Sequence, residues 1–534
     1  MKKKLSERKR KWIERTVAND RSYKLFLYNR FFTFLGSALL QLAAFIFFMF
    51  LIVYHSQYAV VFQLLMFALQ AVFLLYILNK FPRPSCKMGW ILLIVLLPFF
   101  GVPWYLFNGM VQPTRKMRKK LARAKEENQR KIKETYGETP SQTVENRADA
   151  ISAYLSNYAD YPTFAGGEVT YYKAGEEMFP DMLSALEKAE KFVLLEYFII
   201  AHGKMWSEIR KILLEKAAQG VQIRIIYDDF GCIKTLPPRY ERYLEMLSEN
   251  IKCVTFNDVI PMFALRMNNR DHRKILVIDG KVAFTGGINI ADEYIAEKQR
   301  FGYWKDTGVR VKGDAVSSFT RMFMDMWNAF SKEKEDVTKY LLPYAGTHQL
   351  DKKPLRILPY DNSPLTEPNV AEAVYADMIN RAQKYVWIFT PYLVLDEYMR
   401  ATLCAAAMRG VDVRIVTPAI PDKKIVYRMT RANYGVLMQA GVKIYEYTPG
   451  FIHAKNMLCD GESAVVGTIN LDYRSLYHHF ENAVYFSGCE AVKDVERDCN
   501  EVFALSRLCT EKDMRKTWLG KFIDAILRVF ETLL

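Results

Sequence analysis

The chain has 534 residues, of which 51% are hydrophobic, so it holds enough apolar material for more than one folded core. Lys and Arg outnumber Asp and Glu by 74 to 59, and this net charge of +15 favours an anionic partner, either nucleic acid or an acidic membrane. The eight cysteines show no Cys-x-x-Cys pair or other zinc-ligand spacing, which argues against a cysteine-based metal or redox motif.

The chain begins with a basic tail that is followed by apolar sequence. Residues 1–24 contain ten Lys or Arg and three acidic residues, within an expected cytoplasmic tail of residues 1–30. Residues 31–54 form an uncharged apolar run long enough to span a bilayer, and residues 59–78 form a second. We therefore expect a transmembrane hairpin. No cleaved signal peptide is expected, because further apolar stretches follow the first one.

A third apolar stretch, residues 89–107, completes an expected membrane region of residues 31–110. It contains Pro98, Gly101 and Pro103, which disfavour an uninterrupted helix. By the positive-inside rule the basic tail stays in the cytoplasm, and the hairpin returns the chain to that side. A full third span would carry the basic sequence that follows to the outside. We therefore predict a shallow or re-entrant segment in a multi-pass membrane protein, with the rest of the chain cytoplasmic.

Residues 111–160 are polar and highly charged, and we expect a helical or flexible basic linker there. Within it, residues 115–133 hold ten Lys or Arg against two acidic residues. Either a solvated connector or a basic strip lying on anionic headgroups fits this composition. We favour the strip because it directly follows the membrane region, where each basic residue contributes about 1 kcal/mol of attraction.

Two similar α/β lobes are expected next, at residues 161–350 and 351–510. The sequence Gly-Val-x-Ile/Val-Arg-Ile occurs at residue 220 and again at residue 410, which indicates an internal duplication. Strands that alternate with helices predict an α/β fold in each lobe. The expected elements are a strand at 192–200, a helix at 204–218 and a strand at 221–227 in the first lobe, and a strand at 385–394, a helix at 396–409 and a strand at 411–416 in the second.

Each lobe also contains a candidate β-hairpin. The turns are Asp279-Gly280 and Asp460-Gly461, and Asp-Gly between two apolar strands is a strong hairpin signal. An aspartate at such a turn is expected to support the scaffold rather than to take part directly in chemistry. The paired strands are 274–279 with 282–287, and 455–460 with 463–468.

The C-terminal residues 511–534 are expected to form an amphipathic helix. Apolar residues recur at helical spacing from Trp518 to Leu533, while Lys521 and Asp524 belong to the opposite face. A helix that packs on the core and an interfacial membrane helix fit this pattern equally well.

The strongest signal is a motif, His-x-Lys-x4-Asp, that occurs once at each hairpin. Each copy is followed by an asparagine 17 positions after its histidine, and the two copies are 181 residues apart. Residues two apart on a strand share a face, so each histidine and lysine should point together. The residues of the two copies are His272, Lys274, Asp279 and Asn289, and His453, Lys455, Asp460 and Asn470.

An imidazole beside a fixed ammonium suits attack on a phosphodiester. The lysine supplies positive charge to the phosphoryl oxygens. One neutral imidazole can attack phosphorus while a second, protonated imidazole protonates the leaving alcohol. Two motif copies provide both histidines if their loops meet at one site. The pattern does not indicate which histidine is the nucleophile.

Four further residues are candidates for supporting roles. Asn289 and Asn470 offer amide donors to the phosphate. Asp306 lies 34 residues after His272, and Glu481 lies 28 residues after His453. A carboxylate on the far ring nitrogen of a histidine fixes its tautomer. No metal or cofactor is expected, because the lysines supply the charge that a metal would.

The two motifs resemble those of the phospholipase D superfamily, and the flanking sequence resembles that of bacterial cardiolipin synthases of that type. The resemblance extends from the apolar segments to about residue 505. It implies two duplicated phospholipase D-like α/β lobes preceded by N-terminal transmembrane helices. One departure is His479, where the family usually has Asn before Phe-Glu, and this change affects a local hydrogen bond. The matching segments are residues 268–274, 286–294, 449–453 and 467–475.

The resemblance implies phosphatidyl transfer between two phosphatidylglycerol molecules through a phosphohistidine, giving cardiolipin and glycerol. The expected partners are phosphatidylglycerol and anionic membrane lipids, without nucleic acid. A phospholipase D that uses water or another alcohol is the alternative within this enzyme class. Membrane anchoring disfavours a nucleic-acid phosphodiesterase, and two complete motifs disfavour a scaffold with decayed sites. The sequence leaves the oligomeric state open.

Overall fold

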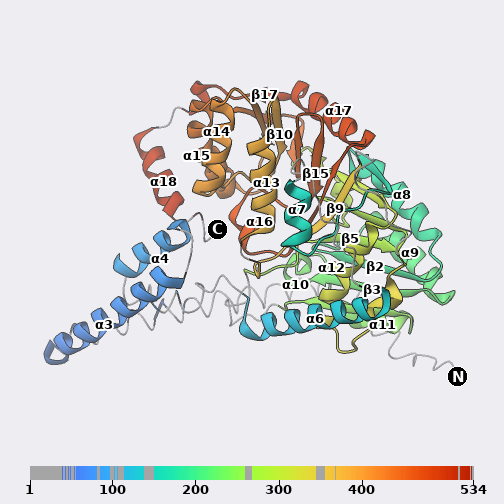
Figure 1. The fold of residues 1–534 in the computed structure, drawn as a ribbon. Helices are drawn as coiled ribbons and strands as arrows, with labels where there is room; N and C mark the ends of the chain where they lie inside the picture. The colour runs from blue at the N-terminus through green and yellow to red at the C-terminus, as the bar shows by residue number, and fades with distance from the viewer. Residues whose placement is uncertain are drawn as a thin grey trace.

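The computed structural model describes residues 56–80, 84–96, 113–137, 150–258, 268–343 and 355–529 except 367, 515 and 516, with residue 531 and isolated positions among residues 39–105. These residues form two α/β lobes side by side, from which two helices extend at one end (Figure 1). Almost all of the predicted segment 31–54, and much of 89–107, lie outside the described residues.

The first lobe is built on a seven-stranded sheet of order β1-β8-β6-β5-β2-β3-β4. Its centre is the parallel set β2, β3 and β4, and the hairpin β5-β6 adds antiparallel to β2. The strands are β1 (Glu168–Tyr172), β2 (Phe192–Tyr197), β3 (Gln222–Asp228), β4 (Ile251–Phe256), β5 (Lys274–Ile278), β6 (Val282–Gly286) and β8 (Gly308–Lys312). The helices are α8 (Gly175–Glu187), α9 (Lys204–Ala218), α10 (Asp229–Cys232), α11 (Tyr240–Leu247) and α12 (Val316–Phe330).

The second lobe repeats this arrangement on an eight-stranded sheet of order β17-β12-β11-β10-β14-β15-β16-β9. Again three parallel strands, β10, β11 and β12, carry an antiparallel hairpin, here β14-β15, next to the first of them. The strands are β9 (Arg356–Asn362), β10 (Tyr385–Phe389), β11 (Asp412–Pro418), β12 (Lys443–Tyr447), β14 (Asn456–Cys459), β15 (Ser463–Gly467), β16 (Glu481–Ser487) and β17 (Ser506–Leu508). The helices are α13 (Val370–Arg381), α14 (Glu397–Met408), α15 (Lys424–Gln439), α16 (Tyr473–Tyr477) and α17 (Glu490–Ala504).

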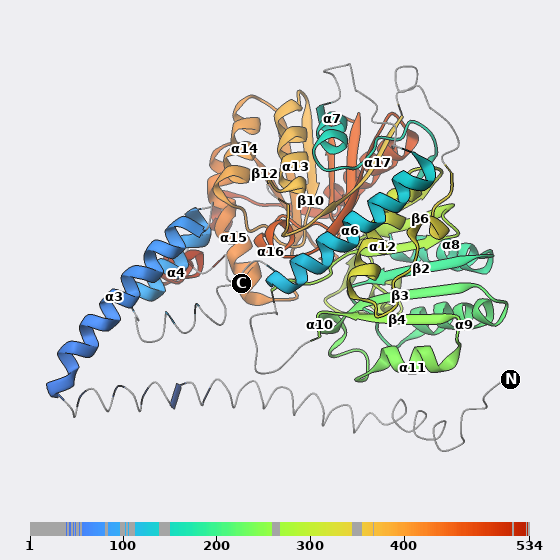
Figure 2. The same cartoon turned by 60° about the horizontal axis from the view of Figure 1, so that its bottom comes forward.

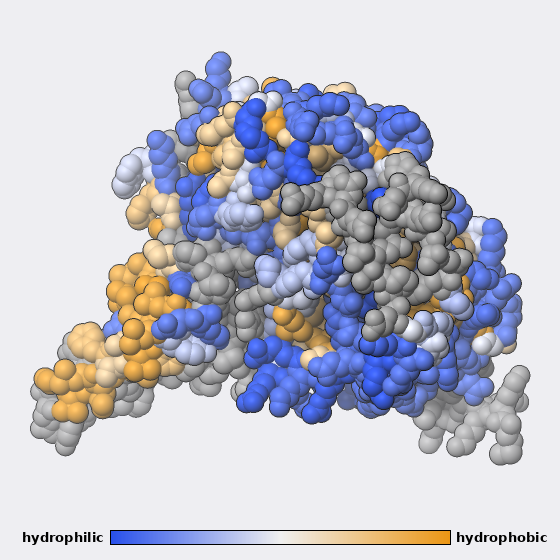
Figure 3. Space-filling view, in the orientation of Figure 1, coloured by the Kyte–Doolittle hydropathy of each residue, from blue (hydrophilic) through white to orange (hydrophobic). Residues whose placement is uncertain are grey.

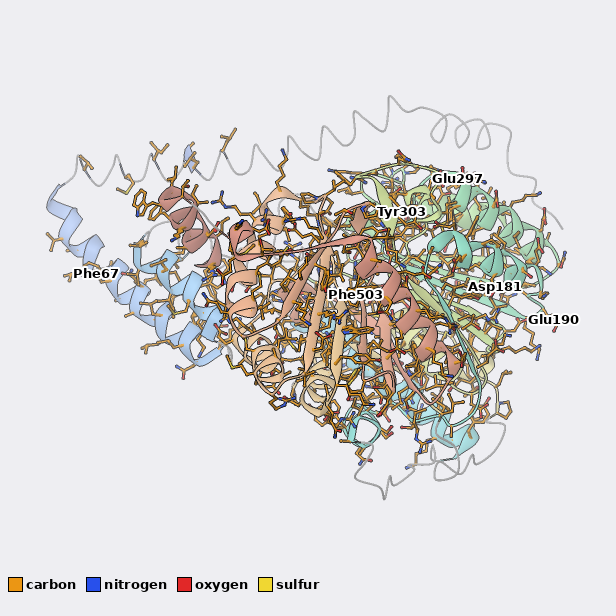
Figure 4. The ribbon with its side chains drawn as sticks, turned by 90° about the horizontal axis from the view of Figure 1, so that it is seen from above. Phe67, Asp181, Glu190, Glu297, Tyr303 and Phe503 are labelled. Atoms are coloured by element: carbon orange, nitrogen blue, oxygen red, sulfur yellow. The ribbon has the colours of Figure 1, made fainter. Side chains whose placement is uncertain are left out.

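The two lobes are joined by backbone pairing as well as by side-chain packing. Strand β7 (Tyr303–Lys305) of the first lobe pairs in parallel with β13 (Gly450–Ile452) of the second. A second link is the isolated parallel β-bridge between Asp271 of the first lobe and Phe480 of the second. Tyr303 accordingly lies near the junction of the lobes when the molecule is viewed from above (Figure 4). The predicted duplicated α/β fold is therefore confirmed, and the lobes share one continuous hydrophobic cluster.

The two hairpin turns are held by their aspartates. Asp279 and Asp460 adopt positive φ angles of 53° and 54°, a conformation that aspartate tolerates in tight turns. The carboxylate of Asp279 accepts three backbone N–H bonds of 2.8 Å at the start of β2, the last of them from Phe192. Asp460 accepts three equivalent 2.8 Å bonds at the start of β10, the last from Tyr385. Both aspartates therefore tie a hairpin to the neighbouring strand.

The predicted basic linker contains a long helix, α6 (Arg115–Tyr136), that packs on the first lobe. Met117 and Leu121 are buried on its inner face, and Asn128 donates a 2.7 Å bond to Asp325 of α12. Figure 2 shows α6 running across α12. Its exposed positions are mostly basic or acidic, so α6 is a docked helix with a charged outer face rather than a free connector.

Helices α3 (Ser56–Lys80) and α4 (Pro84–Leu96) pack against each other, and Gln70 of α3 donates a 2.7 Å bond to the carbonyl of Ile94. Many of their apolar residues are exposed, among them Leu65 and Val72, and Figure 3 shows the hydrophobic surface that results. The expected segment 59–78 lies within α3. In the described part of the chain, no helix meets the length and hydropathy needed to cross a membrane.

Helix α18 (Trp518–Val529) docks on the second lobe through its polar face. Asp524 pairs with Arg428 of α15 at 2.7 Å, and Arg428 also donates to the carbonyl of Gly520. Much of the apolar face points away from the lobe, since Trp518 is 79% exposed and Phe522 is 53% exposed. Leu527 of the same stripe is partly buried against the core, so α18 packs on the lobe with part of its apolar face and exposes the rest.

The aspartate at the first hairpin turn should matter for stability rather than for chemistry. We expect Asp279→Ala to lower the free energy of unfolding by about 1–3 kcal/mol, because it leaves the N–H donors at the start of β2 without their acceptor. Thermal denaturation in detergent checks this result, and the fraction that remains folded should retain near-normal turnover. A stable Asp279→Ala variant with no activity would contradict the structural role.

Candidate active site

The first motif histidine is held by the second lobe. His272 lies two residues before the start of β5, and its backbone N–H donates to the carbonyl of Phe480 at 2.8 Å. Its ring Nδ1 lies 2.7 Å from Oε2 of Glu481, at the start of β16. The histidine side chain is 9% exposed and the glutamate side chain is fully buried. The first histidine therefore takes its carboxylate from the other half of the duplication.

The second motif histidine is held by the first lobe in the same way. The backbone N–H of His453 donates to the carbonyl of Lys305 at 2.7 Å, and its Nδ1 lies 2.6 Å from Oδ2 of Asp306. In both copies the carbonyl that accepts the bond belongs to the residue just before the carboxylate. The parallel pairing of β7 with β13 produces this register for His453, and the bridge between Asp271 and Phe480 produces it for His272.

This exchange of carboxylates brings both motifs to one site. The charge of Lys274 lowers the pKa of the His272 imidazole from within the first lobe, and the charges of Lys455 and His453 lower it from across the lobe boundary. Burial is the largest cause, and it takes the pKa of His272 well below its usual value. Burial and Lys455 likewise lower the pKa of His453 to about 4, although Asp306 opposes them.

Both imidazoles are consequently neutral at pH 7 before a substrate binds. A neutral ring that faces a carboxylate through Nδ1 carries its proton there, which leaves the lone pair on Nε2. Burial alone would raise the pKa of Asp306, but the charges of Lys455 and His453 outweigh it and the pKa is lowered. The carboxylate at His453 is therefore ionised and can fix the tautomer.

The two lysines lie beneath the histidines and are almost fully buried. Lys274 donates to the carbonyl of His272 at 2.7 Å, and Lys455 donates to the carbonyl of His453. Each is 1% exposed. Burial lowers the pKa of Lys274 to about 7 and that of Lys455 to about 8. An arriving phosphate would favour the charged form of both ammonium groups, because opposite charges attract strongly where water is excluded.

The two motif asparagines are placed differently from each other. Asn289 donates to the Tyr294 hydroxyl at 2.8 Å and accepts from the backbone N–H of Ile199, so its amide is engaged within the first lobe. Asn470 is buried, and its Oδ1 has no hydrogen-bond partner among the described residues. The aspartates Asp279 and Asp460 face the hairpin turns described above and not the histidines.

Sequence patterns did not indicate several neighbours of the histidines. Tyr294 and Trp304 pack against His453 with ring centroids 5.6 and 5.5 Å away. Phe198 lies edge-on to His272 at 4.9 Å. Aromatic residues are too frequent in buried strands and turns for their positions to signal such contacts. These rings exclude water from the imidazoles on the sides that face the protein.

His479 also belongs to this neighbourhood. Its ring centroid is 5.7 Å from that of His272, and its Nδ1 lies 3.7 Å from Oε1 of Glu481, too far for a hydrogen bond. Burial lowers its pKa to about 3. Within the described residues, His272, His479 and Glu481 form the one group whose ligand atoms lie close enough to hold a metal ion, within 4.8 Å of one another. Two of these atoms, Nδ1 of His272 and Oε2 of Glu481, are already bonded to each other.

Comparisons with known proteins identify the family to which both motifs belong. The family model described as "Cardiolipin synthase, PLD-like domain" matches residues 182–327 and 375–503, which include both motifs. The chain is 40% identical to an uncharacterized protein of Streptococcus mutans, over 86% of this chain and 99% of that protein. It is 31% identical to a cardiolipin synthase of Geobacillus kaustophilus, over 85% of this chain and 89% of that protein.

Among solved structures, the fold is similar to that of a phosphatidylserine synthase from Haemophilus influenzae. The TM-score is 0.54, and the match covers 72% of this chain and all of that one. The sequence identity is 14%, so this likeness supports the fold alone.

The buried lysines should impose a pH dependence on catalysis. As pH rises through about 7 and 8, Lys274 and Lys455 lose their charge in the free enzyme. If the ammonium forms bind the phosphate, kcat/KM should fall on the alkaline side with pKa values near these, because kcat/KM reports groups of the free enzyme. Initial rates at constant ionic strength check this, and a flat profile to pH 9.5 would contradict the role of the lysines.

The exchanged carboxylates give a second prediction. Asp306→Asn should remove the charge that orients His453 and lower activity by up to about 10⁴-fold, the loss seen for the same change in a catalytic triad. Nitrogen NMR of histidine-labelled enzyme should show altered tautomer signals for His453 and unchanged signals for His272.

The matched control is Glu481→Gln, for which His272 should change and His453 should not. A result in which each carboxylate variant perturbs the histidine of its own lobe would contradict the exchange.

Proposed function

The chain belongs to the family of cardiolipin synthases with phospholipase D-like domains, and on this basis we propose that it is a cardiolipin synthase. The reaction is phosphatidyl transfer from one phosphatidylglycerol to a second, which gives cardiolipin and glycerol. The observation that carries this proposal is the exchanged pair of hydrogen bonds, His272 to Glu481 and His453 to Asp306, which unites two His-Lys pairs in one site. Relatives that bear the name cardiolipin synthase over most of this chain support the substrate.

In the first half of the reaction, Nε2 of one histidine attacks the phosphorus of the donor lipid. The bond between phosphorus and the glycerol oxygen breaks as the bond between phosphorus and nitrogen forms. The other histidine, protonated when the anionic phosphate has bound, gives its proton to the leaving oxygen and releases glycerol. Lys274 and Lys455 stabilise the charge on the phosphoryl oxygens.

In the second half, the acceptor lipid occupies the place that glycerol has left. The histidine that gave up its proton now removes one from the terminal hydroxyl of the acceptor. The hydroxyl oxygen attacks phosphorus, the phosphorus–nitrogen bond breaks, and cardiolipin leaves with both histidines restored. Either histidine can be the nucleophile in this scheme, since both have a carboxylate at Nδ1 and a lysine beneath.

The alternative acceptor is water, which would make the enzyme a phospholipase D-type hydrolase. The chemistry of the histidines is the same for both acceptors. A lipid acceptor is favoured because the curated relatives over most of the chain are named as synthases.

We further propose a multi-pass arrangement in the membrane, with segments 31–54 and 59–78 as a hairpin and 89–107 as a shallow or re-entrant segment. The exposed apolar faces of α3, α4 and α18 support contact with lipid, and α18 contacts α4. In this proposed arrangement the basic outer face of α6 lies near anionic headgroups and both lobes lie at the inner leaflet.

Purified enzyme supplied with phosphatidylglycerol alone should form cardiolipin and release an equal amount of glycerol. Activity should survive a metal chelator, because the lysines stabilise the phosphoryl charge in this mechanism. Thin-layer chromatography and a glycerol assay measure the two products. Phosphatidic acid as the main product would instead favour the hydrolase, and a strict divalent-ion requirement would contradict the lysine-based step.

The topology can be tested with single cysteines in intact cells. An impermeant thiol reagent should label Ser56→Cys, at the start of α3 and the expected outer end of the hairpin, and should not label Ser141→Cys until the cells are opened. A cysteine-free background provides the control. Labelling of Ser141→Cys in closed cells would place the lobes outside and overturn the re-entrant segment.

A further inference from the structure

Cardiolipin synthesis requires two anionic lipids, and the motif residues provide for only one phosphate. The acceptor hydroxyl that attacks phosphorus is joined through a single glycerol to the acceptor's own phosphate. When the hydroxyl reaches the catalytic phosphorus, the second phosphate must therefore lie one glycerol length away. A second anion so close to the first is repelled unless it has cations of its own.

Most cations around the histidines are already engaged. Lys274 and Lys455 bond to the histidine carbonyls. Arg270 donates to the carbonyl of Asn257 and faces Asp228 at 3.6 Å. Arg273 binds Asp361 at 2.6 Å. These groups hold the site together and cannot turn to a second phosphate without leaving a buried carboxylate or carbonyl unpaired.

Arg474 differs from these residues. It is exposed, and among the described residues its guanidinium makes no hydrogen bond or ion pair within 4 Å. Its backbone carbonyl accepts the N–H groups of His478 and His479, at 2.9 and 2.8 Å, and the ring centroid of His479 lies 5.7 Å from that of His272. Desolvation by the surrounding protein lowers the pKa of this guanidinium, and the charge of Asp472 opposes that shift.

Lys423 supplies a second cation next to the same site. It precedes α15, its side chain is 62% exposed, and its Nζ lies 3.3 Å from the Tyr392 hydroxyl. Its charge reaches His272 and contributes to the lowered pKa of that imidazole. Asp422 lies 3.8 Å away and bonds to Tyr392 at 2.7 Å, which leaves Lys423 loosely paired.

Tyr392 connects the two cations to the histidines. Its ring lies under Lys423 at 5.0 Å and interacts electrostatically with Arg474. Its ring centroid lies 6.5 Å from that of Phe451, whose own centroid is 5.9 Å from that of His453. Arg474 and Lys423 therefore flank a surface that adjoins both histidines.

We propose that Arg474 and Lys423 form an anion site for the phosphodiester of the acceptor phosphatidylglycerol, and so select a lipid rather than water or a small alcohol. This inference rests on the proposed function. The planar guanidinium suits two phosphate oxygens at once, and the flexible lysine adds a point charge. The first half of the reaction brings only one phosphate and therefore does not need this anion site.

The test compares two acceptors that share one covalent intermediate. Phosphatidylglycerol as acceptor gives cardiolipin, whereas labelled glycerol as acceptor exchanges into phosphatidylglycerol and brings no phosphate. Both reactions are measured in mixed micelles with Arg474→Gln, Arg474→Lys and Lys423→Gln. Lys211→Gln, an exposed cation on α9 of the first lobe, is the matched control.

For Arg474→Gln we expect cardiolipin formation to need at least about tenfold more acceptor lipid, the loss expected for a charged hydrogen bond. Glycerol exchange should stay within about twofold of wild type, which also shows that the variant folds. Arg474→Lys should recover part of the loss, Lys423→Gln should show a smaller loss, and Lys211→Gln none.

Equal loss of both reactions, or no loss of either, would overturn the acceptor site while leaving the proposed function intact. If the wild-type enzyme exchanges glycerol but forms no cardiolipin, the proposed function fails and the acceptor site fails with it.

Discussion

The hydrogen bond from each motif histidine to a carboxylate of the opposite lobe is the constraint on which the site depends. Neither lobe is complete alone, since His272 needs Glu481 and His453 needs Asp306. The backbone bonds from these histidines to Phe480 and Lys305 fix the same register. Because Glu481 and Asp306 are the next residues in the chain, this register holds each carboxylate at Nδ1 of its histidine. Duplication of one lobe therefore produces a two-histidine site only when the copies pair across β7 and β13.

The electrostatics of the site favour the binding of an anion. Two imidazoles and two ammonium groups lie almost fully buried, and burial lowers the pKa of all four. A phosphodiester adds the negative charge that the cluster lacks, which favours protonation of one imidazole at the moment when a general acid is needed. In the proposed mechanism, substrate binding therefore favours protonation of the imidazole that acts as the general acid in the first step.

Sequence patterns predicted the local parts of this arrangement well. The expected helix at 204–218 is α9 at Lys204–Ala218, and both Asp-Gly turns lie where the hairpin signal placed them. The expected strand 385–394 is shorter, because β10 ends at Phe389 before Pro391, which cannot donate to a ladder. The family resemblance is confirmed by the match to both lobes.

The long-range parts could not be predicted from spacing. Asp306 and Glu481 were found as candidate carboxylates, but distance along the chain does not indicate which lobe a side chain will face. The outward apolar face of α18 was one of two open alternatives, because amphipathic periodicity gives the direction of the stripe and not what covers it. The proximity of Arg474, Lys423 and Tyr392 depends on three segments that are far apart in the sequence and meet only in the folded chain.

The central claim is that the two motifs make one site, and activity measurements on His272→Ala, His453→Ala and the double variant test it most directly. Residues that act as one unit lose activity without additivity. We expect each single variant to lose several orders of magnitude of cardiolipin formation and the double variant to lose no more than either. Two independent sites would instead leave each single variant with about half of the activity. That result would contradict the account.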